Sequence, residues 1–560
     1  MIDTNNDNLW ALYYETDAYT VSGERIMGRQ AAGNALLKAY AKSSLDKIGV
    51  YARTDKSLTD FTNNLRSLLP NDRHKDVVQI PWGNPKESEM FGGIYYPAPD
   101  IDGLANQRFF FGHDNYSIVG ITHTTASESV IKSLISCYTS PLMEWDAIIC
   151  TSNSVKNSFN VIYDQYHAIL SDRIGATRKP QFSLPIIPLG VHTDDYSFSK
   201  TDKAEGRKSL NIDDEDIVLL FLGRISFHAK AHHVPMYLAL EEASKKLGKN
   251  KKIHLIQTGW FPNDHVQKLY EDDAKRISPS INFHYLDGRD KRDKLKSFAI
   301  SDIFISLVDN YQETFGLTPL EAMASKLPVI VSDWNGYKDT VRHEIDGFRI
   351  RSSSMEPGHG YVNALRHNLT YDTYDHYIGR TSQTVALDIN QIIDTIILLS
   401  NNKELRKELG ENGRKRSLEF DWLKVLDLYK DLKENLEEKR EFSKKEKKKS
   451  FLPPITIQDQ YTFFSDYPTE QINNETFIEL NNAINNIDLA EFTSFGSISF
   501  IDGIVPSIDF LKKSIAYIDN NNGCKVENLI NHLEINATEV FRVVLWLSKY
   551  GYVEIKQKNG

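Results

Sequence analysis

The chain has 560 residues and a formal net charge of −10, and it is 41% hydrophobic, 11% aromatic and 25% charged. This is the composition of a globular protein with several hydrophobic cores, and the length predicts about three or four domains. The acidic total argues against a protein that binds nucleic acid by neutralising its phosphates, so we expect no nucleic-acid partner.

Three widely spaced cysteines, Cys137, Cys150 and Cys524, form no CxxC pair and have no zinc-type spacing. They favour a reducing compartment. The first ten residues, MIDTNNDNLW, are polar and acidic and have none of the features of a signal peptide. No run of eighteen apolar residues predicts a transmembrane helix. We therefore expect a cytoplasmic protein, with association at a membrane surface as an alternative.

Residues 1–195 alternate apolar runs with amphipathic segments, a pattern typical of an α/β domain. Strands are predicted at 77–80, 118–122 and 147–150, and the last leads into Thr151-Ser152-Asn153-Ser154, a good helix start. A further strand at 185–191 would connect this domain to the next.

A second α/β pattern occupies residues 196–440. The six apolar residues at 217–222 suit a strand buried on both faces of a parallel sheet. We predict a second doubly wound domain that ends in a long helix opening at Phe420-Asp421-Trp422 and running to about 439. The other strands are predicted at 253–257, 281–285, 303–307 and 328–332, with helices at 235–246, 291–299 and 319–325.

Residues 441–454 contain a lysine run, Lys444 to Lys449, and end at Pro453-Pro454, which predicts a linker. A peripheral membrane contact through these lysines is the alternative, because such clusters attract anionic lipid.

Residues 455–560 are predicted as an accessory domain with helices at 508–518, 526–533 and 538–549 and a strand at 552–555, in the order of a winged helix. The segment from 453 onward has seven Lys and Arg against fourteen Asp and Glu, and the third helix offers only Arg542 as an arginine. This disfavours DNA reading. We interpret the domain as a module for protein docking or for homo-oligomer formation.

The densest functional pattern is NYQETFGLTPLEAMA at 310–324. It predicts a strand end, a glycine-containing loop and a helix start, with Thr318 as N-cap, Pro319 as first helical residue and Glu321 as third. The free N–H groups of such a first turn can hold a phosphate oxygen. A capping box between Thr318 and Glu321 is the structural alternative for that glutamate.

The pattern strongly resembles the retaining GT-B glycosyltransferases of family 4, the glycosyl transferases group 1. Glu313 and Glu321 have the spacing of that family's two glutamates, and LPVIVS at 327–332, Asn335-Gly336 and Asp346-Gly347-Phe348 follow as in the family. The resemblance covers roughly residues 10 to 435. It implies two Rossmann-like domains that face a cleft.

The resemblance also implies roles for individual residues. Glu313 would hold the donor sugar's hydroxyls near the anomeric carbon, and Glu321 would accept hydrogen bonds from the ribose. Arg224 and Lys230 would offset charge on the leaving diphosphate. The backbone N–H groups of Phe315, Gly316 and Leu317 would complete that anion site.

In the first domain, Gly28 of Met27-Gly28-Arg29 is similar to the family's glycine loop, which faces the diphosphate. His123 occupies the position of a family histidine that touches the donor sugar, although a histidine satisfied at a strand end explains the residue equally well. The sequence departs from the family at Asp309 and Asn310, where Pro-Ser is common, and at Ala231, where glycine usually follows the phosphate lysine.

The predicted function is therefore metal-independent, retaining transfer of a hexose from a nucleoside-diphosphate sugar to an acceptor hydroxyl on a glycan, a lipid-linked sugar or a protein. The expected donor is a UDP-sugar in preference to a GDP-sugar, and no cofactor is expected. Alternatives are a GT-B-fold epimerase, a non-catalytic sugar-nucleotide-binding protein, and a metal-dependent transferase. The last would use an Asp-x-Asp such as Asp100–Asp102 or Asp214–Asp216, although both are more simply surface acids.

Overall fold

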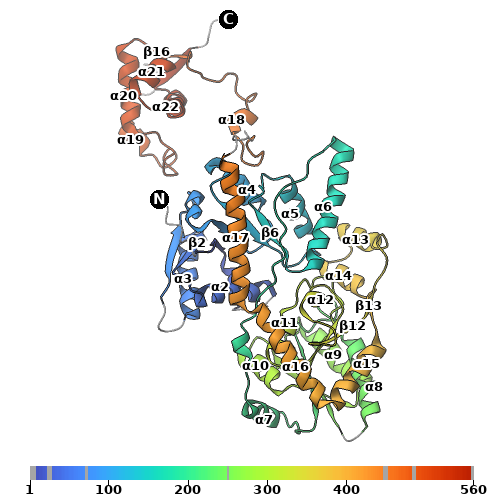
Figure 1. Ribbon diagram of the computed structural model, residues 1–560. Coiled ribbons are helices and arrows are strands. Elements are labelled where there is room, and N and C mark those ends of the chain that lie inside the picture. Colours follow the sequence, from blue (N-terminus) through green and yellow to red (C-terminus); the bar gives the residue numbers. More distant parts are fainter. Residues whose placement is uncertain are drawn as a thin grey trace. The chain divides into compact units, whose positions relative to one another are not determined.

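The computed structural model describes residues 8–21, 28–69, 74–248, 251–445, 452–481 and 487–556. It divides into two compact units, Met1–Ile457 and Gln458–Gly560 (Figure 1). The first unit carries both α/β domains, and each unit has its own hydrophobic core.

The first α/β domain is built on a parallel sheet with six strands among the described residues, in the order β3-β2-β1-β4-β5-β6. Its core covers both faces of the sheet, and the predicted strands near 77, 118 and 147 are confirmed. The strands are β1 (Ala11–Tyr14), β2 (Lys47–Ala52), β3 (Asp76–Ile80), β4 (Gly93–Tyr95), β5 (Ser117–Ile121) and β6 (Ala147–Ile149).

Helices connect these strands in the usual parallel-sheet manner. The helix start predicted at 151–154 is confirmed, because the Ser152 side chain accepts a hydrogen bond from the Val155 N–H at 3.3 Å. The helices are α1 (Thr16–Tyr19), α2 (Gly28–Lys42), α3 (Asp55–Leu68), α4 (Asp102–Arg108), α5 (Glu128–Thr139) and α6 (Asn153–Ile174), with 3₁₀ turns at Pro85–Phe91 and Phe109–Phe111.

The second α/β domain contains a parallel sheet whose described strands follow the order β12-β11-β10-β7-β8-β9. All six residues of β7 are buried, as the apolar run predicted. The strands are β7 (Ile217–Leu222), β8 (Ile253–Gly259), β9 (Ile281–Asp287), β10 (Ile303–Ser306), β11 (Val329–Ser332) and β12 (Gly347–Ile350), beside a small ribbon of β13 (Ser352–Ser353) and β14 (Ala386–Leu387). The architecture of two Rossmann-like sheets is thus confirmed.

The helices of this domain include those predicted at 235–246, 291–299 and 319–325. They are α7 (Lys200–Lys208), α8 (His233–Leu247), α9 (Asp264–Ile277), α10 (Lys291–Ile300), α11 (Leu317–Ala324), α12 (Tyr337–Thr340), α13 (Tyr361–Asn368), α14 (Tyr374–Ser382), α15 (Ile389–Asn401) and α16 (Lys403–Ser417), with 3₁₀ turns at Thr193–Tyr196 and Leu418–Phe420.

The long closing helix, α17 (Trp422–Lys445), begins two residues later than predicted and returns to the first domain (Figure 1). The ring of Tyr429 lies 6.0 Å from those of Trp10 and Tyr95, and Arg440 donates to the Gly92 carbonyl at 2.7 Å. The first domain is therefore completed by a segment that follows the second in sequence.

The connector at 185–191 is not the continuous strand that its apolar residues predicted. Cys150 pairs with Ile186 and Val191 with Asp421 as isolated bridges. Thr193 donates through its N–H and hydroxyl to the Asp421 carboxylate, at 3.2 and 2.7 Å. The two chain crossings between the domains are thus tied to each other.

The second unit has the predicted order of three helices and a strand, and its strand pairs in an antiparallel three-stranded sheet, β16-β15-β17. The sequence analysis missed the strands β15 and β16 and the short helices α18 and α19. The elements are α18 (Gln460–Phe463), β15 (Phe477–Leu480), α19 (Leu489–Thr493), α20 (Ile508–Asn520), β16 (Cys524–Lys525), α21 (Val526–Leu533), α22 (Ala537–Lys549) and β17 (Val553–Lys556).

Candidate functional site

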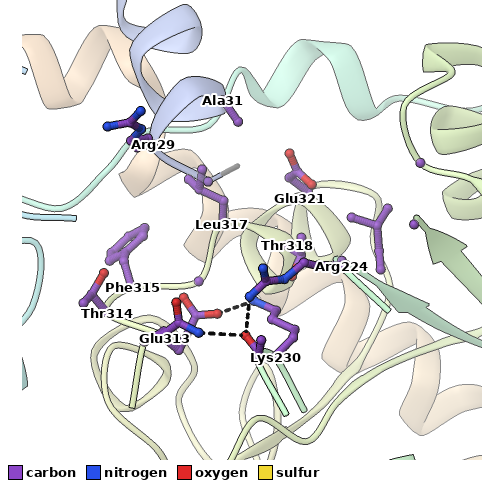
Figure 2. Close-up of a pocket in the computed structure, with 18 of the residues that line it drawn as sticks. Arg29, Ala31, Arg224, Lys230, Glu313, Thr314, Phe315, Leu317, Thr318 and Glu321 are labelled. Atoms are coloured by element: carbon purple, nitrogen blue, oxygen red, sulfur yellow. Dashed lines mark hydrogen bonds and ion pairs between the residues drawn. The ribbon is translucent and has the colours of Figure 1, made fainter. Parts of the chain in front are cut away.

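A cavity of about 390 Å³ lies between the two α/β domains. The first domain contributes the start of α2 and the residues that follow β5, and the second contributes the loops after β7, β8, β9 and β10 and the start of α11 (Figure 2). Ligands of parallel α/β sheets bind at these carboxyl ends of the strands. Every residue that the sequence analysis assigned to the site lines this one cavity: Gly28, His123, Arg224, Lys230, Glu313, Phe315, Gly316, Leu317 and Glu321.

Gly316 shapes the loop that leads into α11. Its φ of +86° is left-handed, and a β-carbon there would lie 2.0 Å from the ring of Tyr337. Tyr337 is fully buried and hydrogen-bonds Ser306 at 2.9 Å, so it cannot move aside easily. Only glycine fits this position.

The helix α11 begins two residues earlier than predicted. Gly316 is the N-cap and no side chain caps the helix, so the predicted capping role of Thr318 and its capping box with Glu321 are wrong. Thr318 lies inside the first turn because the left-handed glycine already starts the helix. The first-turn N–H groups consequently border the cavity without a capping side chain.

Lys230 and Glu313 form an ion pair at the cavity wall, and their side chains are 21% and 12% exposed. Arg224 lies beside them (Figure 2) and donates to the Ala229 carbonyl at 2.9 Å. Burial lowers the pKa of Arg224, and the charge of Asp375 opposes that shift. No carboxylate of the described residues forms a salt bridge with Arg224, so most of its donors remain available to an anion.

Glu321 points into the cavity from α11 (Figure 2). Its Oε1 accepts from Lys294 at 2.8 Å, and its Oε2 is buried and accepts no hydrogen bond. A buried carboxylate oxygen without a donor is costly. A ligand hydroxyl is a suitable donor for it.

The first domain closes the cavity with α2 and His123. Gly28 has open space around its α-carbon, while Met27 lies outside the described residues. The ring Nε2 of His123 lies 2.9 Å from the Pro97 carbonyl and must donate to it, so Nδ1 is the acceptor. Burial lowers the pKa of His123 to about 4, which keeps the ring neutral at pH 7.

Hydrogen bonds join the two domains beside the cavity. Ser152 at the start of α6 donates to the Thr314 carbonyl at 2.8 Å, and the Thr314 hydroxyl donates to the His123 carbonyl. Asp339 on α12 accepts from the Asn153 N–H at 2.7 Å and from its amide nitrogen at 3.1 Å. We call these contacts the interdomain latch. They hold the loop that carries Glu313 against the first domain.

The sequence analysis missed several residues that line the cavity, among them Lys294 and Trp260. Lys294 lies on α10, which immediately precedes β10, the strand that leads into the motif. Nothing in the sequence indicates that this lysine pairs with Glu321. The departures from the family pattern at Asp309 and Asn310 lie at the site, whereas Ala231 does not line the cavity. Asn310 lines the cavity and donates to the His228 carbonyl at 2.9 Å, and Asp309 is buried behind it.

Asp100 and Asp102 lie at the surface as expected, but the interpretation of Asp214–Asp216 as surface acids is wrong for Asp216, which is buried. Asp216 precedes β7 and bonds His254 at 3.0 Å, and Asp102 accepts from Ser136 at 2.5 Å. Among the described residues, no group of three or more His, Cys, Asp or Glu is arranged to hold a metal ion.

The helices described here include none that combines the length and apolarity needed to cross a bilayer. Lys444 bonds Glu441 at 2.8 Å and Glu89 at 3.3 Å. Lys447, Lys448 and Lys449 of the proposed membrane-contacting run lie outside the described residues.

Comparison with known proteins finds similarity over part of the chain. Residues 202–378 match the model of the family glycosyl transferases group 1. An uncharacterized glycosyltransferase of Methanocaldococcus jannaschii is 25% identical over 214 residues, 33% of this chain and 47% of that protein. The D-inositol 3-phosphate glycosyltransferase of Rhodococcus erythropolis is 28% identical over 168 residues, 29% of this chain and 36% of that protein. The chain thus spans less than half the length of these relatives.

Solved structures resemble a larger part of the chain. Anabaena HepE in complex with UDP and glucose has a TM-score of 0.47 at 16% identity, covering 77% of this chain and 99% of that one. The sucrose-phosphate synthase of Thermosynechococcus elongatus has a TM-score of 0.45 at 17% identity, with the same coverage.

The chain itself has the features that its sequence resemblance implied. Two parallel Rossmann-like sheets face one cavity, which is the GT-B arrangement, and the paired glutamates lie in the segment that matches the family model. In residues 202–378, the chain is thus similar to the glycosyl transferases group 1 family.

Proposed function

We propose that this protein is a retaining glycosyltransferase that moves a hexose from a nucleoside-diphosphate sugar to an acceptor hydroxyl. The observation that carries the proposal is the cavity in which Arg224, Lys230 and the uncapped start of α11 meet Glu313 and Glu321. Cations and backbone N–H groups suit a diphosphate, and carboxylates suit the hydroxyls of a sugar and a ribose.

Stabilisation of the leaving diphosphate would be the main catalytic task. Breaking the bond at the anomeric carbon develops oxocarbenium character on the sugar and negative charge on the diphosphate. Arg224 and Lys230 would bind that charge together with the N–H groups at the start of α11. Prearranged donors lower the activation free energy most when they lie where negative charge develops in the transition state.

The two glutamates would orient the donor. Glu321, with its unpaired Oε2, would accept a ribose hydroxyl, and Glu313 would bind hydroxyls of the transferred sugar. Neutral His123 would contact the sugar through Nδ1 or its ring edge. Glu313 is held at the cavity wall by its ion pair with Lys230.

The finer assignments follow the family resemblance. The acceptor hydroxyl would attack from the face of the leaving group, which gives retention, and a diphosphate oxygen would take the proton. A UDP-sugar is proposed as donor in preference to a GDP-sugar.

A thermal-shift panel of UDP-, GDP- and ADP-sugars tests the donor site directly, because a ligand that binds the native state raises the melting temperature according to its affinity. We expect the largest shift with a UDP-sugar and slow release of UDP from it. A shift without any turnover would identify a non-catalytic binding protein, and an altered nucleotide sugar would identify an epimerase. The absence of a shift with every nucleotide sugar would contradict the proposal.

Lys230→Ala and Arg224→Ala should each lower turnover by roughly one to three powers of ten, comparable with the loss of one oxyanion donor. Donor turnover by purified protein is the measurement. The matched control is Lys245→Ala, which removes an exposed lysine of α8 paired with Glu242. Unchanged turnover in Lys230→Ala would refute its assignment.

Turnover in excess EDTA tests the metal independence proposed for the reaction. Because protein cations would neutralise the diphosphate, we expect the rate to stay within about twofold of the untreated enzyme. Loss of activity that Mg²⁺ or Mn²⁺ restores would instead support a metal-dependent reaction.

A further inference from the structure

An aromatic cluster lies at the carboxyl edge of the first sheet, outside the residues assigned to the donor. We define it as Tyr13 and Tyr51, the second-last residues of β1 and β2, together with Trp82 and Tyr96, which follow β3 and β4. The rings of Tyr51 and Trp82 stack at 4.7 Å, and Tyr13 meets Tyr96 edge-on at 4.8 Å. Tyr13 also lies 5.9 Å from Trp82, so the rings form one continuous surface.

Part of this surface is open. Tyr51 is buried, while Tyr13, Trp82 and Tyr96 are only half-buried and pack on the core from its rim. The Tyr51 hydroxyl donates to the Trp82 backbone carbonyl at 3.0 Å. This hydrogen bond restrains the position of the tryptophan. The cluster therefore presents rigid ring surface.

Carboxylates border the same rings. Burial, followed by the charge and hydrogen bonding of Glu15, raises the pKa of Tyr13. Burial and then the charge of Asp100 raise the pKa of Tyr96. These causes locate Glu15 and Asp100 close to the tyrosine hydroxyls. The charge of Arg53 opposes the shift at Tyr13, so the surface combines aromatic faces with carboxylates and a nearby cation.

The cluster adjoins the donor cavity through one loop. Tyr96 is followed by Pro97, whose carbonyl accepts from the His123 ring at 2.9 Å, and His123 lines the cavity. This loop is packed tightly on β5, because a β-carbon at Gly120 would lie 2.7 Å from the Ala98 carbonyl oxygen. A ligand on the rings would therefore lie next to the site proposed for the transferred sugar.

We propose that the aromatic cluster binds the acceptor, and that this acceptor is a saccharide. The C–H faces of a sugar ring pack against electron-rich aromatic faces, and its hydroxyls donate to carboxylates. Glu15 and Asp100 supply the acceptors, while Tyr13, Trp82 and Tyr96 supply the faces. The inference rests on the proposed transferase function and names the substrate class of its second site.

Binding of the labelled full-length chain to an array of defined oligosaccharides tests the proposal. We expect the wild type to bind a subset of saccharides. Tyr96→Ala should weaken this binding about tenfold, which corresponds to about 1.4 kcal/mol. Tyr96→Phe keeps the ring and should retain most of the binding. Trp82→Ala should act like Tyr96→Ala, and melting curves of each variant show whether it is folded.

The matched control is Phe110→Ala, which removes an aromatic ring of the same domain that is 54% exposed and outside the cluster. No saccharide binding by the wild type would overturn the inference, and so would binding that folded Tyr96→Ala and Trp82→Ala both retain. The thermal shift of the wild type with UDP is read separately. A shift without saccharide binding would overturn only the acceptor site, whereas no shift would contradict the donor proposal.

Discussion

At the scale of single residues, Asp309 is a carboxyl group that the fold buries behind the interdomain cavity. It is 5% exposed, and burial raises its pKa to about 7 although the His232 N–H donates to it at 3.3 Å. A carboxyl pKa raised in the folded state contributes stability that is present below about pH 4 and is lost as the pH rises through 7. Above pH 7 the native protein therefore carries a buried charge.

Asp309→Asn should remove that cost while it keeps the acceptor for His232. We expect the variant to melt a few degrees above the wild type at pH 8.5, with a smaller difference at pH 4.5. Melting curves at both pH values provide the measurement, and Asp394→Asn, an exposed acid of α15, sets the background. A difference independent of pH would mean that Asp309 is not the titrating group.

The residues of the interdomain cavity were largely predictable because one dense motif and two cations match a family pattern. Glu313, Glu321, Arg224 and Lys230 all line one cavity. Lys294 was missed because its pairing with Glu321 depends on how α10 and α11 pack, which sequence spacing does not encode. The catalytic roles of these residues stay predictions until they are tested.

At the scale of elements, the interdomain latch couples the start of α6 to the second domain. Asp339 accepts from the first N–H of α6 and places a carboxylate at the positive end of that helix. A carboxylate from the same domain would cap the helix equally well. Because this one comes from the opposite domain, it stabilises the helix and the closed cleft together.

Asp339→Ala should open the cleft and cost about 1 kcal/mol, the usual value of a lost cap. We expect a larger radius of gyration by small-angle X-ray scattering and a lower melting temperature. Asp164→Ala removes an acid of α6 that pairs with Lys179 within the first domain, so it should change neither the radius nor the cleft. An unchanged radius in Asp339→Ala would show that other contacts hold the domains.

Element boundaries were predicted less well than element types. The start of α11 was misplaced because Thr318 and Pro319 look like a cap and first position, whereas the left-handed φ of Gly316 begins the helix earlier. The connector at 185–191 has the composition of a strand, but it has only isolated bridges because it passes between two sheets. The start of α11 and the path of the connector both depend on tertiary structure, which the local sequence pattern does not reveal.

At the scale of the whole molecule, the two compact units have separate cores. A chain ending at Ile457 should therefore keep the cooperative unfolding and the nucleotide-sugar thermal shift of the full chain. Calorimetry should show that only the transition of the second unit is lost. A truncated chain that fails to fold would mean that the units depend on each other. As a control, a chain ending at Asp421 lacks α17 and should not fold.

That control points to how the protein must mature during synthesis. The first sheet can form once β6 has left the ribosome. The contacts of Trp10 and Tyr95 with Tyr429 cannot form until α17 has also been synthesised. At about 5–20 residues per second, this partner emerges roughly 10–60 s later. During that interval the apolar side chains that α17 will cover are exposed on the nascent chain. We therefore expect chaperones to bind it most strongly before α17 is translated.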